Sequence, residues 1–404
     1  MFDHQGYSEH VVDYQIEKTV PYAKYADRTP LGLESPTKAA LKVIRDNIVD
    51  GACPADDFSI AKSFENSLVL LKKYATLDWE HCLDIFRVEN AIRAYAKDAK
   101  RKKPLNIVMH ASPGTGKSHF VECLADAMKE DGVGQVTVNM TSIGGVDDLS
   151  GPLDEVRNLK VKGKLPILFL DEFDSDPQNY ALLLPLLWDG KVAIGGRTIE
   201  LGKFVTILAG SKREIDSALV EARNMKYDVG KSSKKDHQSK LPDLVSRING
   251  PEITIPDLDL VDLKKDRCRK VDKVCLTISL LKERFGSDLR KVPWALLKFV
   301  SDTKFQYGVR SITNLVDSIE RVDLTNGAVR LNDLIFPFAD EKTLKESHLP
   351  IHIRERDGVS GIIRRWKNLC ACDKLVEFEL DPRTLRKYSQ NLYDALLLKK
   401  PKGK

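Results

Sequence analysis

The stretch from residue 111 to residue 118 reads ASPGTGKS, and it constrains the fold more than any other part of the chain. An apolar run at 105–109 precedes it, and a helical pattern over 118–129 follows it. This is the context in which the P-loop pattern G-x-x-x-x-G-K-[ST] occurs, and the chain departs from that pattern only at Ala111, where a small residue replaces the first glycine. A strand, a glycine-rich turn and a helix in this order predict a parallel sheet with an anion-binding loop at its edge.

The composition of the loop suits a triphosphate. Gly114 and Gly116 allow backbone N–H groups to approach phosphate oxygens closely. Lys117 would hold the β- and γ-phosphates, and the Ser118 hydroxyl would bind Mg²⁺, so ATP and Mg²⁺ are the expected ligands. His119 is counted with the site, and a packed or surface helix position is its alternative. The candidate nucleotide-binding residues of the loop are Ser112, Pro113, Gly114, Thr115, Gly116, Lys117 and Ser118.

A second feature, a pair of acidic residues, follows the glycine-rich loop by about fifty residues. The buried-looking run at 167–170 ends in Asp171 and Glu172. Ligands gather at the carboxyl ends of parallel strands, so both acids should emerge beside the phosphate loop. Asp171 would hold Mg²⁺, and Glu172 would orient and polarise the attacking water. An acidic start to the next helix is the alternative interpretation.

The remaining patterns divide the chain into four parts. Strand and helix signals alternate over 105–256, which predicts an α/β fold with a P-loop core, a parallel sheet flanked by helices. Residues 257–325 look helical throughout, and apolar clusters near 68–71 and 85–96 predict further amphipathic helices. In the tail, a helix followed by a strand is expected within 353–380. The predicted parts are an N-terminal mostly helical region at 1–78, a nucleotide-binding core at 79–256, a helical lid at 257–325 and a small α+β extension at 326–404.

The order and spacing of these motifs resemble the AAA+ ATPases, and within them the Clp- and HslU-type branch. The stretch from 183 to 201 is similar to a helix and β-hairpin inserted before the sensor strand of that branch, and turn signals at Asp189-Gly190 and Gly195-Gly196 agree. By the resemblance, Ser211 ends the sensor-1 strand and would contact the water. Arg247 would be an arginine finger reaching a neighbouring subunit, and Arg310 a sensor-2 residue of the lid.

The resemblance implies hydrolysis of ATP at the subunit interfaces of a homo-oligomer, a hexameric ring, that remodels a macromolecular client. The first expectation is therefore a protein client or partner effector. A nucleotide-gated scaffold that switches a partner effector is the second hypothesis, favoured because 141–151 has no aromatic pore-loop residue. A nucleic-acid motor is the third, suggested by the basic stretch at 226–240.

The net charge and the number of cysteines do not decide between these three hypotheses. A net charge of +5 over 404 residues neither demands nor excludes nucleic acid. Seven cysteines without a framework spacing predict reduced thiols, with a zinc site at Cys370 and Cys372 as the alternative. The chain begins without a secretion-signal pattern and has no apolar run near the ~20 residues that span a bilayer. The expectation is a cytoplasmic protein that does not enter a membrane.

Overall fold

A computed structural model describes residues 43–60, 69–71, 74–75, 79–176, 179–210, 241–259, 266–286, 288–319, 324, 326–330 and 340–378. Ser211, the basic stretch at 226–240 and the first 42 residues lie outside this part of the chain.

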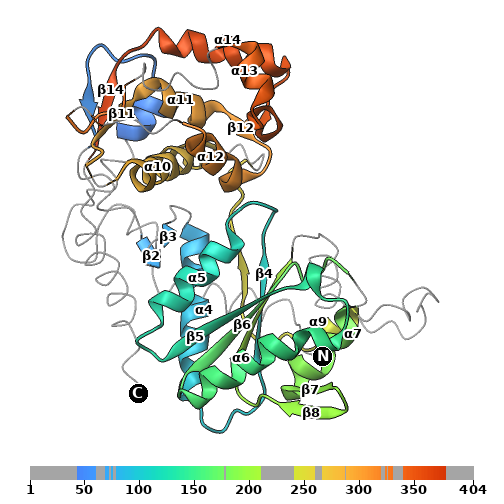
Figure 1. Ribbon diagram of the computed structural model, residues 1–404. Helices are drawn as coiled ribbons and strands as arrows, with labels where there is room; N and C mark the ends of the chain where they lie inside the picture. Colours follow the sequence, from blue (N-terminus) through green and yellow to red (C-terminus); the bar gives the residue numbers. More distant parts are fainter. Residues whose placement is uncertain are drawn as a thin grey trace, which may run out of the picture.

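Five parallel strands form the central sheet, in the order β10-β4-β9-β6-β5 (Figure 1). The inner strands β4, β9 and β6 are buried along almost their whole length, as expected for strands covered on both faces. The predicted α/β core with a parallel sheet is therefore confirmed, and the runs expected at 105–109 and 167–170 agree with β4 and β6 to within two residues. The strands are β4 (Leu105–His110), β5 (Val133–Asn139), β6 (Leu165–Asp171), β9 (Val205–Gly210) and β10 (Glu252–Thr254).

Two hydrophobic layers cover the sheet because successive side chains of a strand point to opposite faces. On β4, Ile107 and Met109 pack with α4 and α5, whereas Val108 packs with α6 and α7 on the other face. A hairpin of β7 and β8 follows α7, as the turn signals predicted. These elements are α4 (Trp79–Lys97), α5 (Lys117–Ala127), α6 (Ser150–Val161), α7 (Asn179–Asp189), β7 (Lys191–Ile194), β8 (Arg197–Glu200) and α9 (Leu241–Val245), with the short turns η2 (Met140–Ser142) and η3 (Val146–Leu149).

A second, mainly helical body carries the lid (Figure 1). The prediction of uninterrupted helix over 257–325 is wrong in part, because β11 and β12 lie between the helices and pair with strands of the C-terminal segment. The expected helix and strand of the tail are confirmed as α14 and β14. The elements are α10 (Asp266–Phe285), β11 (Lys291–Pro293), α11 (Trp294–Asp302), β12 (Lys304–Phe305), α12 (Gly308–Asp317), α13 (Glu341–Glu346), η6 (Leu349–His352), β13 (Ile353–Arg354), α14 (Gly358–Cys370) and β14 (Leu375–Glu377).

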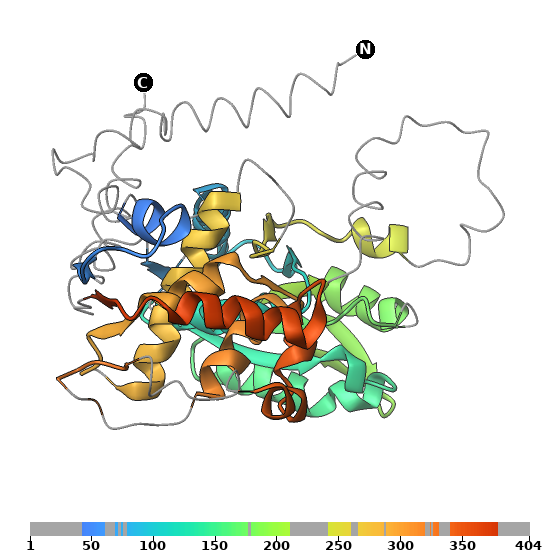
Figure 2. The same ribbon diagram turned by 90° about the horizontal axis from the view of Figure 1, so that it is seen from above.

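Residues 43–60, which precede the nucleotide-binding core in sequence, pack into this second body. Ile44, Ile48 and Ile60 share one hydrophobic cluster with α10, α11 and α14. The Trp294 indole N–H donates to the Asn47 carbonyl at 2.8 Å. We call residues 43–60 together with the described residues of 266–378 the lid unit. Figure 2, seen from above, shows α14 running across this unit.

Short strands join the two ends of the lid unit into one sheet. β1 (Phe58–Ser59) is parallel to β14, and β11 is antiparallel to it, giving the order β1-β14-β11. The other described elements ahead of the core are the π-helical turn η1 (Arg45–Val49), β2 (Val69–Leu71) and β3 (Tyr74–Ala75). The helix expected near 68–71 is therefore wrong, because β2 and β3 form an antiparallel pair. The four-part division of the chain stays a prediction, and the contacts of the lid unit run across its boundaries.

The cysteines differ from the prediction of uniformly reduced thiols. Cys53 and Cys372 form a disulfide that joins the two ends of the lid unit, although 319 positions separate them in sequence. Cys275 and Cys370 are free thiols. Among the described residues, no cluster of three potential metal ligands occurs, so the alternative of a zinc site at Cys370 finds no support in them. In the same part of the chain, every helix is too short or too polar to cross a bilayer.

Candidate nucleotide-binding and active site

The phosphate loop lies between the end of β4 and the start of α5, as the sequence predicts. Gly114 and Gly116 have φ angles of +82° and +94°, in the left-handed region that glycine adopts without steric cost. A Cβ added at Gly116 would meet no atom within 4 Å, so the space next to this glycine is open. Thr115 closes the loop internally, because its hydroxyl donates to the Ser112 carbonyl at 2.8 Å. The first N–H groups of a helix lack partners within it, so the start of α5 directly after this turn is suited to binding an anion.

The acid pair at the end of β6 lies directly against this loop. The Lys117 ammonium is 2.5 Å from the Glu172 carboxylate and 3.5 Å from that of Asp171. The Ser118 hydroxyl donates to Asp171 Oδ2 at 3.2 Å. The Lys117 side chain is only 6% exposed, so its charge is balanced by the two carboxylates rather than by bulk water. The four residues that the sequence assigned to phosphate, metal and water thus meet within hydrogen-bond or ion-pair distance.

Glu172 has an unusual backbone for a residue with a side chain. Its φ angle is +54°, and only Asn326 shares a positive φ among the described non-glycine residues. This left-handed conformation costs roughly 1–2 kcal/mol for a non-glycine residue. Strained backbone of this kind concentrates at functional sites, where the surrounding structure holds it. Here it turns the chain sharply after β6 and brings the Glu172 carboxylate back toward the loop.

The donor set is suited to a magnesium ion that is shared with phosphates. Mg²⁺ prefers oxygen ligands and takes only one or two from the protein when phosphates supply others. The Ser118 hydroxyl and the Asp171 carboxylate present such oxygens side by side, at 3.2 Å. The side chains present therefore fit the ion.

The lid reaches the same loop through the start of α12. The Arg310 backbone N–H donates to the Gly114 carbonyl at 3.1 Å. Gly114 lies so close to Tyr307 that an added Cβ would collide with the Tyr307 carbonyl oxygen. Gly114 therefore serves the lid contact as well as the phosphate cradle, a role that the motif alone did not indicate.

The buried His352, from the C-terminal segment, supports this lid contact. The Ser311 hydroxyl accepts from the Tyr307 N–H and lies 3.1 Å from His352 Nδ1. Burial, followed by the positive charges of Arg310 and His348, lowers the pKa of the His352 imidazole. His352 was not among the predicted residues, and no sequence pattern links it to residues 307–311.

Arg247 lies far from its own phosphate loop. The backbone carbonyl of Arg247 accepts a hydrogen bond from Asn106, at the beginning of β4, whereas the loop follows the end of that strand. The Arg247 guanidinium donates to the Asp243 carbonyl and to the Ser246 hydroxyl at 3.3 Å. The guanidinium therefore makes local contacts away from its own phosphate loop, and its role as a finger stays a prediction.

Of the two remaining predicted site residues, His119 lies in the described part of the chain and Ser211 lies outside it. His119 is exposed on α5, with its imidazole 3.6 Å from the Cys123 sulfur and its ring centroid 6.3 Å from that of Tyr74. It lies beside the loop without contacting the acid pair. Ser211 is outside the described residues, directly after β9.

Comparison with known proteins supports the class of the core. The model of the Torsin family, a family of AAA+ ATPases, matches residues 72–146, which include the phosphate loop. No curated protein matches the chain. The family match, the strand order and the site together support an ATPase of the AAA+ class. The narrower assignment to a Clp- or HslU-type branch stays a prediction.

Two solved structures show loose similarity over much of the chain. NtrX from Brucella abortus in complex with ATP is 17% identical, covers 73% of this chain and 69% of its own, and gives a TM-score of 0.42. The S. cerevisiae Hsp104–ADP complex is also 17% identical, covers 60% of this chain and 47% of its own, and gives a TM-score of 0.38.

Proposed function

We propose that this protein is a Mg-dependent ATPase that hydrolyses ATP at the interfaces of a homo-oligomer and uses the movement to remodel a macromolecular client. One observation carries the proposal: Lys117 lies against Asp171 and Glu172, at 3.5 Å and 2.5 Å, with Ser118 beside them. A lysine, a hydroxyl and two carboxylates around a glycine cradle are what phosphoryl transfer to water requires.

Each group has a distinct task in this proposal. The loop amides and Lys117 bind the phosphates, while Ser118 and Asp171 hold Mg²⁺. The ion, when bound, neutralises charge on the phosphate oxygens. Glu172 accepts a hydrogen bond from the attacking water and takes its proton. Ser211, which directly follows β9 in sequence, would orient the same water.

The ion pair of Lys117 and Glu172 gives the site a resting state. While its carboxylate is paired with the Lys117 ammonium at 2.5 Å, that carboxylate oxygen is occupied and cannot also accept a hydrogen bond from water freely. Phosphates that attract Lys117 draw it away from Glu172, and the carboxylate becomes available to water. ATP binding would therefore release Glu172 from Lys117, and the carboxylate would act as a base only when ATP is bound.

Two arginines would sense the nucleotide. Arg310 starts the lid helix, and its backbone already contacts Gly114, so its side chain can report the γ-phosphate to the lid. Arg247 would stabilise charge on the γ-phosphate of the adjacent subunit. Rotation of the lid unit against the core is the movement that hydrolysis would drive.

Steady-state ATPase assays with a panel of variants test the proposal. The wild type should release phosphate only with Mg²⁺, whereas Glu172→Gln should bind ATP and turn it over at least about 100-fold more slowly. Arg247→Ala should also lose activity, with ATP turnover lower than that of the wild type by about 10³-fold or more. Mixing these two inactive proteins should recover activity, because some interfaces would have both groups intact. A folded wild type without affinity for MgATP would refute the whole proposal.

The client is tested separately. Stimulation of turnover by an unfolded polypeptide would support remodelling of a protein. The absence of an aromatic residue in 141–151 favours the second candidate, a nucleotide-gated scaffold, which would show slow turnover that such a polypeptide leaves unchanged. Stimulation by single-stranded nucleic acid would instead support a motor.

A further inference from the structure

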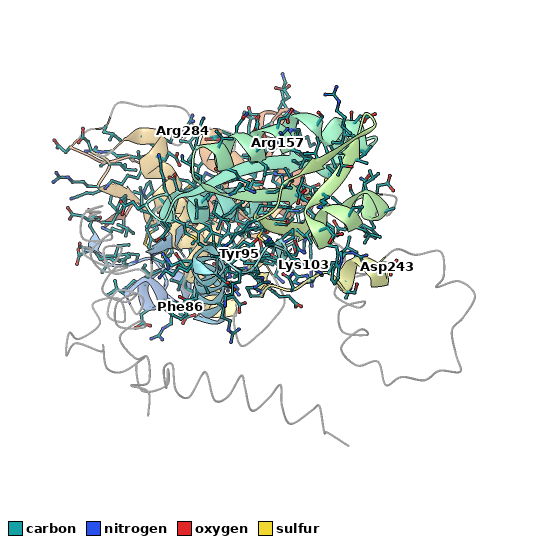
Figure 3. All side chains as sticks on the ribbon, turned by 90° about the horizontal axis from the view of Figure 1, so that it is seen from below. Phe86, Tyr95, Lys103, Arg157, Asp243 and Arg284 are labelled. Carbon is teal, nitrogen blue, oxygen red and sulfur yellow. A yellow bond between two sulfur atoms is a disulfide. The ribbon has the colours of Figure 1, made fainter. Side chains whose placement is uncertain are left out.

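Lysine and arginine side chains gather at the amino end of the central sheet, opposite the phosphate loop. The segment 97–103, KDAKRKK, runs from the end of α4 toward β4 and holds five cations against one carboxylate, that of Asp98. The formal net charge of the whole chain is only +5, so much of its surplus is concentrated here. A second segment, 160–164 with the sequence KVKGK, lies between the last turn of α6 and β6. Figure 3 views the molecule from this end and labels Tyr95 and Lys103.

Hydrogen bonds from two lysines hold these segments side by side. The Lys203 ammonium donates to the Ala96 carbonyl at 3.1 Å and to the Asp98 carbonyl at 2.7 Å. The Lys160 ammonium donates to the carbonyl of Leu201, two positions before Lys203. The turn that precedes β9 therefore connects the end of α4 with the end of α6.

The fold itself accounts for three of the cations. Lys97 and Lys160 lie in the last turns of α4 and α6, where positive charge complements the helix dipole. Lys203 satisfies carbonyls at the end of α4. The remaining cations of this end form no ion pair with a carboxylate in the described part of the chain. We call these six residues the basic end: Lys100, Arg101, Lys102, Lys103, Lys162 and Lys164.

The basic end is presented to solvent and is only partly restrained. Lys100 and Lys102 are exposed. The Arg101 guanidinium is 5.2 Å from the ring centroid of Tyr95, and the Lys103 ammonium is 3.3 Å from that of Trp188. A ring contact of this kind orients a cation without neutralising it, so the positive charge remains available to an anion.

The chemistry of the basic end favours a phosphate backbone over other polyanions. Five of its six cations are lysines, and lysine is depleted from the interfaces between proteins. Stable binding to a membrane surface needs apolar area as well as charge, and Val161 is the single exposed large hydrophobic residue of the two segments. Nucleic acid carries a phosphate charge every ~3.4 Å along each strand, and lysines that neutralise these charges release counterions.

We propose that the basic end binds the phosphate backbone of nucleic acid without reading its sequence. The ring at its centre supports backbone contact, because Tyr95 is buried beneath the cations and offers no face to a base. The six-residue strand β4, about 17 Å long at ~3.3 Å per residue, separates the basic end from the phosphate loop. Nucleic acid and ATP would therefore occupy opposite ends of the core. The inference is independent of the proposed function, because this binding needs no ATP.

Fluorescence anisotropy of labelled oligonucleotides, without ATP, tests the proposal. At low salt the wild type should bind with a Kd of about 10⁻⁶ M or below. The double variant Lys100→Glu/Lys102→Glu should bind at least about tenfold more weakly. Its plot of log Kd against log salt should lose about 1.4 in slope for a single strand or about 1.8 for a duplex, as two phosphate contacts disappear. Parallel titrations with single-stranded DNA, duplex DNA and RNA identify which backbone is preferred.

The matched control changes the same charge on the lid unit. Lys304 and Lys367 are exposed lysines there, and Lys304→Glu/Lys367→Glu alters the net charge of the chain by the same amount. This control should bind nucleic acid with wild-type affinity and salt dependence. An equal loss in both double variants would show that total charge alone governs binding, and would overturn the proposal. Unfolding in urea checks that each variant is folded.

The remaining outcomes also decide. A folded wild type that binds none of the oligonucleotides at low salt overturns the inference and leaves the proposed function intact. If Lys100→Glu/Lys102→Glu instead loses binding to phosphatidylserine vesicles and keeps its affinity for nucleic acid, the basic end is a membrane surface and the proposal is wrong. Should that variant fail to fold, Lys162→Glu/Lys164→Glu replaces it, and wild-type affinity there overturns the proposal. A wild type that binds nucleic acid through these residues but releases no phosphate from ATP would support the inference and refute only the proposed function.

Discussion

Replacing Cys372 by serine should destabilise the lid unit while leaving the phosphate loop intact. The disulfide to Cys53 spans 319 positions, and the chain-entropy relation for a loop of that length gives about 6 kcal/mol of stabilisation. In the folded state the two ends are held together in any case, because β1 pairs with β14 and the Ile60 N–H donates to the Glu377 carbonyl at 2.7 Å. The bond therefore acts chiefly on the unfolded chain. Removal of native disulfides typically costs about 2–5 kcal/mol, and we expect a loss within that range.

Urea unfolding followed by tryptophan fluorescence is a suitable assay. Trp294 and Trp366 both belong to the hydrophobic core of the lid unit. The matched control is Cys370→Ser, which removes a free thiol two positions from Cys372 and should leave the transition nearly in place. Reductant should shift the wild type toward the Cys372→Ser curve and should not shift the variant.

Two results would refute this reasoning. One is an unfolding midpoint of Cys372→Ser that coincides with that of the unreduced wild type. The other is alkylation of Cys53 in denatured, unreduced wild-type protein, which would show that the bond is absent. Burial raises the pKa of the free Cys370 thiol to about 11, so in the native protein at neutral pH Cys370 should be alkylated slowly.

Three further changes test the site and the lid contact. Lys117→Ala removes the cation that binds the phosphates and should weaken MgATP binding at least about 100-fold by calorimetry; unchanged affinity would contradict its role. Gly114→Ala imposes a side chain at a φ of +82° and should lower the free energy of unfolding by about 1–3 kcal/mol in urea, so an unchanged midpoint would contradict the close contact with the lid. Burial and the charges of Arg310 and His348 lower the pKa of His352 in the folded protein below its ordinary value of 6.5. The folded state is therefore favoured while His352 is neutral, above pH 6.5, and this contribution to the free energy of unfolding is lost as pH falls through the lowered pKa. His352→Gln should therefore flatten the loss of unfolding free energy from about pH 7 to about pH 5, and parallel pH profiles of the variant and the wild type would argue against it.

The parts predicted well from the sequence are those governed by local rules. Apolar runs of strand length placed the central strands, and the glycine spacing placed the phosphate loop before α5. The meeting of Lys117 with Asp171 and Glu172 followed from one rule, that the carboxyl ends of parallel strands share an edge. In contrast, the apolar run near 68–71 predicts a helix but forms the strand β2, because a short apolar run alone does not distinguish the two.

The parts that were missed depend on contacts between distant positions. Asn106 is one polar residue in the apolar run LNIVMH, and a buried amide needs partners, but its partners lie 81 and 141 positions away. The disulfide joins positions separated by 319 residues, which no cysteine spacing indicates. The predicted role of His119 is not tested by its placement on α5.

The union of residues 43–60 with the C-terminal segment has a mechanical consequence. The chain leaves the lid unit after residue 60, forms the core, and returns to the lid unit by residue 266, so two covalent connections join the bodies instead of one. Each covalent connection limits the displacement of the lid unit from the core, so two connections permit fewer relative movements than one. A cut in the backbone between 60 and 79 would remove one of these limits without touching the catalytic groups.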